Sequence, residues 1–183
     1  VLATVMGGVV RATWSGLGCP DWPLCHGQII PPGDLSAWLE YLHRLSAAVL
    51  GLLTLLTVFA GYSRFRSGGL RTFLALLVVL LVAQGTLGGV AVLTELAPEL
   101  ALAHTGLGAA FTGLLALLAA RSVPISRLPQ LGGPAGYRVW WLLVALTGVA
   151  FVQVLVGAYV TRMGAFLSCP DLPLCGVPLE QMG

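Results

Sequence analysis

Charge is scarce in this sequence. Only 9% of the 183 residues are charged, lysine is absent, and all nine basic residues are arginine. Soluble domains carry about 25% charged residues, so this chain has too little charge to cover a water-facing surface. A net charge of +2 and an isoelectric point near 8.5 provide no basic face for a nucleic acid. Disorder is excluded as well, because it requires low hydrophobicity and high charge.

Long apolar stretches fill most of the chain instead. Hydrophobic residues make up 57% of it, and the mean hydropathy is +0.93. A helix of about 20 apolar residues spans a bilayer core. Such stretches occur at about 37–63, 70–94, 100–120 and 138–161, with a shorter apolar segment at about 1–17. The sequence therefore predicts an all-α integral membrane protein, a transmembrane helix bundle with five spans.

Basic and acidic residues separate along the chain. Six arginines fall in two loops, which the positive-inside rule makes cytoplasmic: Arg64, Arg66, Arg71, Arg121, Arg127 and Arg138. All seven acidic residues fall in or beside the other polar segments, at 12–40, 94–99 and 162–183. We expect these three segments to face outward.

A cysteine motif occurs twice. Cys-Pro-Asp-Trp-Pro-Leu-Cys at 19–25 returns as Cys-Pro-Asp-Leu-Pro-Leu-Cys at 169–175. A separation of 150 residues is too long for a solenoid repeat and fits a duplicated bundle. We expect a first four-helix repeat at 1–122, a cytoplasmic linker at 123–137, and the first helix and outer loop of an incomplete second repeat at 138–183. Because the second repeat is incomplete, we expect the chain to be a fragment of a longer protein.

The four cysteines form two close pairs, Cys19 with Cys25 and Cys169 with Cys175. On the oxidising face of a membrane, with two prolines bending each intervening segment, they favour two local disulfides. Reduced structural thiols are one alternative, and a metal site is a weaker one because the spacing is not Cys-x-x-Cys. A catalytic dithiol is a third, although the aspartate inside each motif would raise the pKa of a thiol.

Two histidines lie inside predicted spans at similar depth. His43 is about six residues and His104 about five residues from the outer ends of their helices, which is on the order of 8 Å at 1.5 Å per residue. Ionisable residues within a membrane are costly and mark candidate sites. Two imidazoles at one level favour a haem iron held in the bundle interior. The alternative is that each histidine hydrogen-bonds a neighbouring helix.

Polar residues near His43 extend this candidate site. Glu40 and His43 share a helix face at i and i+3, so Glu40 can orient the imidazole or act on a substrate as a base or electrostatic stabiliser. Arg44 suits a haem propionate or, equally, an interfacial position with its charge in water. His26 follows Cys25 in the outer loop, where a solvated side chain is expected.

Small residues and glutamines indicate close helix packing. Gly85, Gly88 and Gly89 follow Gln84 in one span, and a second small-residue run occupies 106–110. Such residues let helix backbones approach in a membrane. Gln84 and Gln153 are predicted to hydrogen-bond between helices.

Together these motifs resemble the haem A synthase family of the Cox15/CtaA type. The resemblance rests on Gly-Gly-Val-Val-Arg11, Gly18-Cys-Pro-Asp-Trp-Pro-Leu-Cys-His-Gly27, Glu40-x-x-His43-Arg44, Ala103-His104-Thr-Gly106 and the second cysteine motif. It covers essentially the whole chain. Members have eight helices in two four-helix halves and convert the C8 methyl group of haem O into the formyl group of haem A. This sequence matches the first half and the fifth helix.

The resemblance implies roles for these residues. His43 and His104 would hold the iron of substrate haem O, with Arg44 beside them, and Glu40 would be the catalytic acid. Both cysteine pairs would be outer-loop disulfides, and a role for the first in relaying reducing equivalents stands beside the structural one. The haem b of the family belongs to a second half whose histidine pair has no counterpart here.

The implied activity is an oxidoreductase acting on a methyl group by successive hydroxylations, in the plasma membrane of a prokaryote. Expected partners are haem O, membrane lipid, haem O synthase, the cytochrome oxidase assembly machinery and other copies of the chain. One alternative is a haem b electron-transfer subunit, which needs both histidines but not Glu40. A membrane thiol-disulfide oxidoreductase would depend on the cysteines, and a structural assembly factor would bind no haem.

Overall fold

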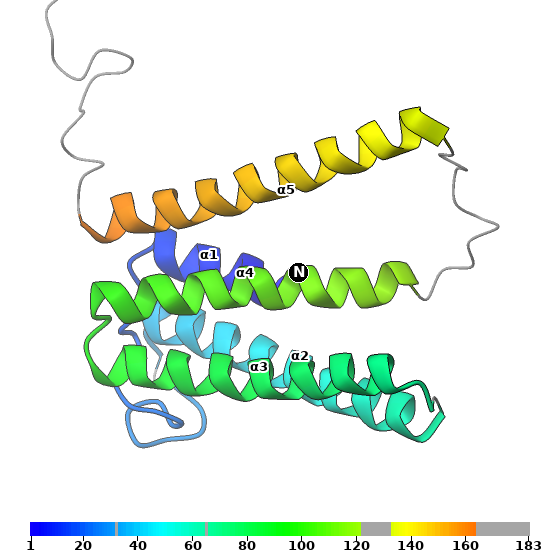
Figure 1. The fold of residues 1–183 in the computed structure, drawn as a ribbon. Helices are drawn as coiled ribbons and strands as arrows, with labels where there is room; N and C mark the ends of the chain where they lie inside the picture. Colours follow the sequence, from blue (N-terminus) through cyan, green and yellow to red (C-terminus); the bar gives the residue numbers. More distant parts are fainter. Residues whose placement is uncertain (32, 65, 122–132, 164–183) are drawn as a thin grey trace, which may run out of the picture. The chain divides into compact units, whose positions relative to one another are not determined.

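The computed structural model describes residues 1–31, 33–64, 66–121 and 133–163 (Figure 1). Within these ranges the chain forms five α-helices and no strand. They are α1 (Leu2–Ala12), α2 (Leu35–Arg64), α3 (Gly68–Leu93), α4 (Pro98–Arg121) and α5 (Gly133–Arg162). The prediction of an all-α membrane bundle is confirmed.

The helices follow the hydropathy of the sequence closely. Four are long and apolar enough to cross a membrane, with spans at Leu35–Arg64, Gly68–Leu93, Pro98–Ala120 and Tyr137–Thr161. The apolar segment expected at 1–17 forms a helix of only 11 residues, α1. It ends where the backbone of Trp14 turns into the left-handed region, with φ of 57°. The protein is therefore a multi-pass membrane protein.

The chain divides into two compact units, Val1–Pro129 and Gln130–Gly183. In the first, α1 packs against α2, α2 against α3, and α3 against α4, and contacts between α4 and α1 close the ring (Figure 1). Apart from α4 and α1, the neighbouring pairs in this four-helix bundle are consecutive in sequence, because short connections make adjacent helices antiparallel neighbours.

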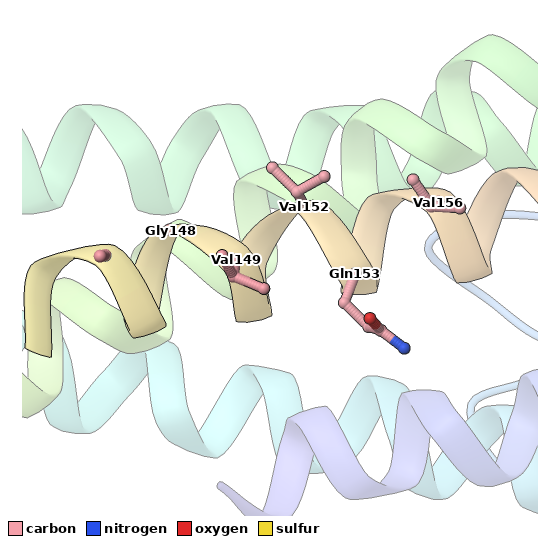
Figure 2. Close-up of a pocket in the computed structure, with 6 residues that line it drawn as sticks. Gly148, Val149, Val152, Gln153 and Val156 are labelled. Carbon is pink, nitrogen blue, oxygen red and sulfur yellow. The ribbon is translucent and has the colours of Figure 1, made fainter. Parts of the chain in front are cut away.

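The described part of the second unit consists of α5. Its apolar side chains are largely exposed, and a shallow hollow runs along one face of the helix (Figure 2). The hollow is lined by Gly148, Val149, Val152, Gln153 and Val156, together with Ala145. Gln153 is the polar residue among those that line the hollow. The interhelical hydrogen bond expected of Gln153 stays a prediction.

One end of the four-helix bundle contains a cluster of buried apolar side chains. Leu74 and Leu77 of α3 and Phe111 of α4 are buried together. Side chains from the second half of α2 pack against them, including Leu50 and Val58. This cluster uses the later parts of α2 and α4 and the earlier part of α3, which meet at one end of the bundle because the helices alternate in direction.

The other end of the bundle is closed by the loop between α1 and α2. Gly18 lies so close to the backbone of Ser36 and Ala37 that a Cβ atom there would collide with it. The Trp22 ring lies against Gly89 of α3, where a Cβ would come within 2.8 Å of it. The loop is thereby held against the start of α2 and the end of α3.

Leu77 tests the apolar cluster. It is fully buried, whereas Val79 on the same helix is 63% exposed. We expect Leu77→Ala to lower the free energy of unfolding by about 2–5 kcal/mol, because it leaves a cavity among packed side chains. Val79→Ala should change that free energy by no more than about 0.5 kcal/mol. Denaturant unfolding in mixed micelles measures both, and equal effects would contradict the described packing.

Candidate functional site

An ion pair on α2 lies at the centre of the polar end of the bundle. Arg44 Nε donates to Glu40 Oε1 at 3.0 Å, one helical turn away. Glu40 is only 5% exposed. A buried carboxylate requires a charged or hydrogen-bonded partner, and Arg44 supplies it.

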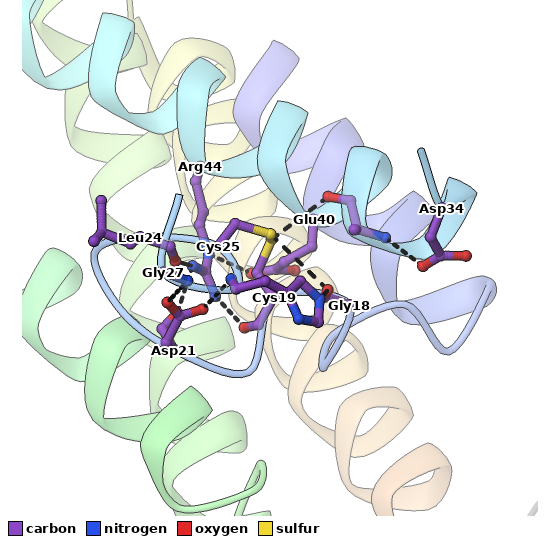
Figure 3. The surroundings of a disulfide bond; sticks show 11 residues. Gly18, Cys19, Asp21, Leu24, Cys25, Gly27, Asp34, Glu40 and Arg44 are labelled. Carbon is purple, nitrogen blue, oxygen red and sulfur yellow. Dashed lines mark hydrogen bonds and ion pairs between the residues drawn. A yellow bond between two sulfur atoms is a disulfide. The ribbon is translucent and has the colours of Figure 1, made fainter. Parts of the chain in front are cut away.

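The same guanidinium also binds the loop between α1 and α2. Figure 3 shows the Arg44 side chain reaching from α2 into this loop. Arg44 Nη1 donates to the carbonyl oxygens of Asp21 and Leu24, both at 2.8 Å, and Nη2 donates to that of Cys19 at 2.7 Å. Together with the bond to Glu40, these contacts use four of the five N–H groups of the guanidinium. The sequence suggested a propionate partner or an interfacial position for Arg44, and gave no sign of these loop contacts.

A disulfide closes the loop that Arg44 binds. Cys19 and Cys25 are bonded, with a Cα–Cα distance of 4.6 Å, and both are almost fully buried. The backbones of Cys25 and Gln28 exchange two hydrogen bonds, at 2.9 and 3.0 Å. The prediction of a disulfide is confirmed for this pair, while Cys169 and Cys175 lie outside the described residues.

Asp21 organises the turn that follows the disulfide. Its carboxylate accepts hydrogen bonds from the backbone N–H groups of His26, at 2.6 Å, and Gly27, at 2.7 Å. The N–H of Gly27 is the largest cause that lowers the pKa of Asp21, because such a bond favours the charged form. His26 is exposed, as expected of a loop residue, and its Nε2 lies 2.9 Å from the carbonyl of Gly18.

His43 projects from α2 toward α1. Its Nδ1 lies 3.1 Å from the carbonyl oxygen of Ala3. A carbonyl oxygen only accepts, so Nδ1 carries the proton and the lone pair of the neutral ring is on Nε2. The ring lies against Gly7 of α1, where a Cβ would come within 3.0 Å of Cε1.

His104 projects from α4 toward α3 in a matching way. A Cβ on Gly88 would come within 2.7 Å of its Cε1. Gln84 Nε2 donates to the carbonyl of His104 at 3.1 Å and lies 3.4 Å from its ring Nε2. The amide nitrogen is only a donor, so the ring Nε2 accepts and Nδ1 carries the proton. The predicted interhelical role of Gln84 is confirmed.

Two polar atoms beside this contact have no partner. Within the described residues, Gln84 Oε1 and His104 Nδ1 are buried and make no hydrogen bond. Buried polar groups are normally satisfied, so an orphaned pair needs a reason. One common reason is that the two atoms face a site that binds a polar ligand or water.

The two imidazoles form a matched pair. Each projects from the second helix of a hairpin onto a glycine of the first. In both, the deduced tautomer puts the lone pair on Nε2, which within the described part of the chain has no partner in His43 and accepts from Gln84 in His104. Among the described residues no three His, Cys, Asp or Glu side chains gather to hold a bare metal ion. Two imidazoles from different helices are a donor set that suits a haem iron.

Gly7 and Gly88 are the site residues that sequence reasoning did not single out. Gly88 lies in a small-residue run that was expected to bring helices together, and Gly7 lies in the Gly-Gly-Val-Val-Arg motif at 7–11. The same two segments also contain Gly8 and Gly85, whose Cβ positions meet nothing within 4 Å. Only the rotation of each helix about its axis decides which glycine faces an imidazole.

Comparison with known proteins places these features in a family context. The model of the family described as "Cytochrome oxidase assembly protein" (COX15-CtaA) matches residues 1–37 and 33–181. No solved structure matches the chain.

Curated relatives match nearly the whole chain. A Heme A synthase from Shouchella clausii is 31% identical over 181 residues, which cover 96% of this chain and 60% of the relative. The Heme A synthase of Shewanella oneidensis is 32% identical over 194 residues, covering 96% and 57%. That of an Exiguobacterium species is 29% identical over 178 residues, covering 96% and 58%. The chain thus spans about three-fifths of the length of these curated relatives.

The glycine contacts predict a position-specific effect of added methyl groups. Gly88→Ala should lower the free energy of unfolding by about 1–3 kcal/mol, because the new Cβ forces the His104 ring to move. Gly85→Ala, on the same helix, should be neutral or stabilising by up to about 1 kcal/mol, since alanine favours a helix. Gly7→Ala and Gly8→Ala form the equivalent pair on α1. Denaturant unfolding measures all four, and indistinguishable values within each pair would contradict the contacts.

The pKa of Asp21 predicts how the loop responds to acid. Because this pKa is lowered from 3.8, the carboxylate bonds to the two amides are fully present above pH 3.8. They are lost only as the pH falls through the lowered pKa. The amide resonance of Gly27 should therefore titrate with a midpoint below 3.8, and Asp21→Asn should abolish the step. A midpoint at or above 3.8 would mean that the amides do not favour the charged form.

Proposed function

The chain belongs to the COX15-CtaA family of cytochrome oxidase assembly proteins, and we propose that it carries the substrate-binding half of a haem A synthase. Residues 1–122 would form the half that binds haem O. The loop closed by Cys19 and Cys25 would lie on the outer face of a prokaryotic plasma membrane. The observation that carries the proposal is the matched pair of imidazoles, His43 and His104, in the polar half of one bundle.

The two histidines would bind the iron of haem O through their Nε2 atoms. His43 is already oriented for this by the Nδ1 bond to Ala3. At His104 the amide of Gln84 lies beside Nε2, so Gln84 has to move aside when the iron binds. The carbonyl of Ala3 and the glycine contacts would then keep the rings in place, which reduces the ordering cost of binding.

Glu40 would act on the methyl group that is oxidised. Two successive hydroxylations, each a two-electron oxidation, would convert the methyl into a hydrate that loses water to give the formyl group, so the reaction requires an oxygen source and an external electron acceptor in addition to these residues. Glu40 would stabilise positive charge that develops at the methyl carbon or accept its proton. Arg44 engages Oε1, one of the two carboxylate oxygens, and so holds the charged form in place. The low exposure of Glu40 strengthens such electrostatic effects, because water does not screen them.

Haem binding tests the histidine pair. We expect His43→Ala and His104→Ala each to lower the haem content of the purified protein at least about tenfold, since each removes an iron ligand. His26→Ala removes an exposed loop imidazole and should leave the haem content unchanged. Pyridine haemochrome absorbance per protein measures the content. Unchanged haem in both helix variants, in folded protein, would contradict the proposed ligands.

Product analysis tests the role of Glu40. In a host that supplies haem O, mass spectrometry of extracted haems should find hydroxylated haem O or haem A above an empty-vector control. Glu40→Gln should retain haem O and lower the oxidised products by about 10²-fold or more, a usual effect of losing an acid–base group. Glu99→Gln, which changes an exposed acid in the first turn of α4, is the matched control.

The same experiment separates the proposal from its main alternative. A haem b electron-transfer subunit would keep its haem and its spectrum in Glu40→Gln and would yield no oxidised haem O. Haem O alone in the unaltered chain would mean that the substrate binds here and that oxidation requires further residues. Absence of any haem in folded protein would contradict the proposal.

A further inference from the structure

One guanidinium connects the disulfide loop to Glu40. On the side of α2, Arg44 Nε is 3.0 Å from Glu40 Oε1. On the side of the loop, its two terminal nitrogens lie 2.7–2.8 Å from three carbonyl oxygens. Hydrogen bonds with a charged donor are short and strong at such distances. Glu40 and the loop therefore share a single partner.

The three carbonyls that bind Arg44 all belong to the ring that the disulfide closes. They come from Cys19, Asp21 and Leu24, within the segment 19–25. Three acceptors can converge on one guanidinium only if this short segment is folded back on itself. The disulfide, together with the backbone pair of Cys25 and Gln28, holds it in that shape. An open segment would sample many conformations in which the carbonyls point apart.

We propose that Arg44 is a positioning residue that couples closure of the Cys19–Cys25 loop to the placement of Glu40. With the loop closed, the carbonyls fix the guanidinium, and the guanidinium fixes the carboxylate. With the loop open, Arg44 keeps only its bond to Glu40 and both side chains gain rotamer freedom. What Glu40 does to a substrate rests on the proposed function, whereas the coupling itself does not.

Coupling of this kind is reciprocal. If closing the loop stabilises the Arg44–Glu40 pair, then the pair must stabilise the closed loop by the same free energy. Breaking the pair from the side of Glu40 should therefore make the disulfide easier to open, although among the described residues no hydrogen bond joins Glu40 to either cysteine. If Arg44 stabilised the loop independently of its ion pair with Glu40, the substitution of Glu40 would not change how easily the disulfide opens.

Thiol–disulfide exchange with dithiothreitol measures the coupling on the haem-free chain. Two electrons and two protons pass from dithiothreitol to the disulfide, which gives two thiols and cyclic oxidised dithiothreitol. We expect Arg44→Lys to raise the equilibrium constant for opening at least about tenfold, because an ammonium group cannot reproduce the planar fork of four bonds. Glu40→Gln should raise it about threefold or more. In the Arg44→Lys background, Glu40→Gln should have no further effect.

Two controls separate the coupling from general loss of stability. Glu99→Gln and Arg71→Lys make the same chemical changes on other helices and should leave the exchange constant unchanged. A Glu40→Gln constant equal to that of the unaltered chain overturns the proposal. So does an effect of Glu40→Gln that persists in full in the Arg44→Lys background, because it cannot then pass through Arg44.

An infrared measurement tests the coupling in the opposite direction and does not require Arg44 to be altered. The carboxylate band of Glu40 is identified by its loss in Glu40→Gln. Replacing both Cys19 and Cys25 by serine should shift this band and broaden it, because the carboxylate loses its fixed partner. An unchanged band in folded protein overturns the proposal. Both measurements use protein without haem, so failure of the haem oxidation experiment and failure of this coupling are distinguishable.

Discussion

The polar end of the bundle depends on the hydrogen bonds of the Arg44 guanidinium. A carboxylate that is buried must find a charged or hydrogen-bonded partner within the protein. One side chain satisfies Glu40 and three carbonyls at distances of 2.7–3.0 Å. The disulfide, the Asp21 turn and the close contact of Gly18 with α2 all hold the loop where this is possible. Without the cation, the buried carboxylate and the nearby carbonyls would need other partners.

The two ends of the bundle differ in composition: one end is packed with apolar side chains and the other contains the candidate site. Leucine and phenylalanine side chains from α2, α3 and α4 fill one end, where tight van der Waals packing holds the helices together. The other end carries the imidazoles, Gln84 and the ion pair, and the 11-residue helix α1 packs there. In both hairpins a glycine on the first helix makes room for the imidazole of the second. This shared solution explains why His43 and His104, far apart in sequence, occupy equivalent positions.

Much of this arrangement could be predicted from the sequence. The long helices begin and end within a few residues of the expected spans, because twenty apolar residues in a row have few other stable states. The Cys19–Cys25 bond followed from close spacing and bending prolines, and the contact of Gln84 with α4 from a polar residue inside an apolar helix. The binding partners of the Arg44 side chain could not be predicted. From its position on α2 the guanidinium can reach water, a ligand or a loop, and the loop conformation depends on contacts with α2 and α3.

The sequence by itself determined the membrane class, the approximate boundaries of the long helices, the first disulfide and the residue types that carry chemistry. These follow from local composition and spacing, which act along the chain. Only the tertiary structure decided that Gly7 and Gly88 rather than Gly8 and Gly85 face the imidazoles, and that Trp22 lies on Gly89. It also decided that Arg44 joins Glu40 to the disulfide loop. Each of these depends on the rotation of one helix against another, which many small contacts set together and no single segment encodes.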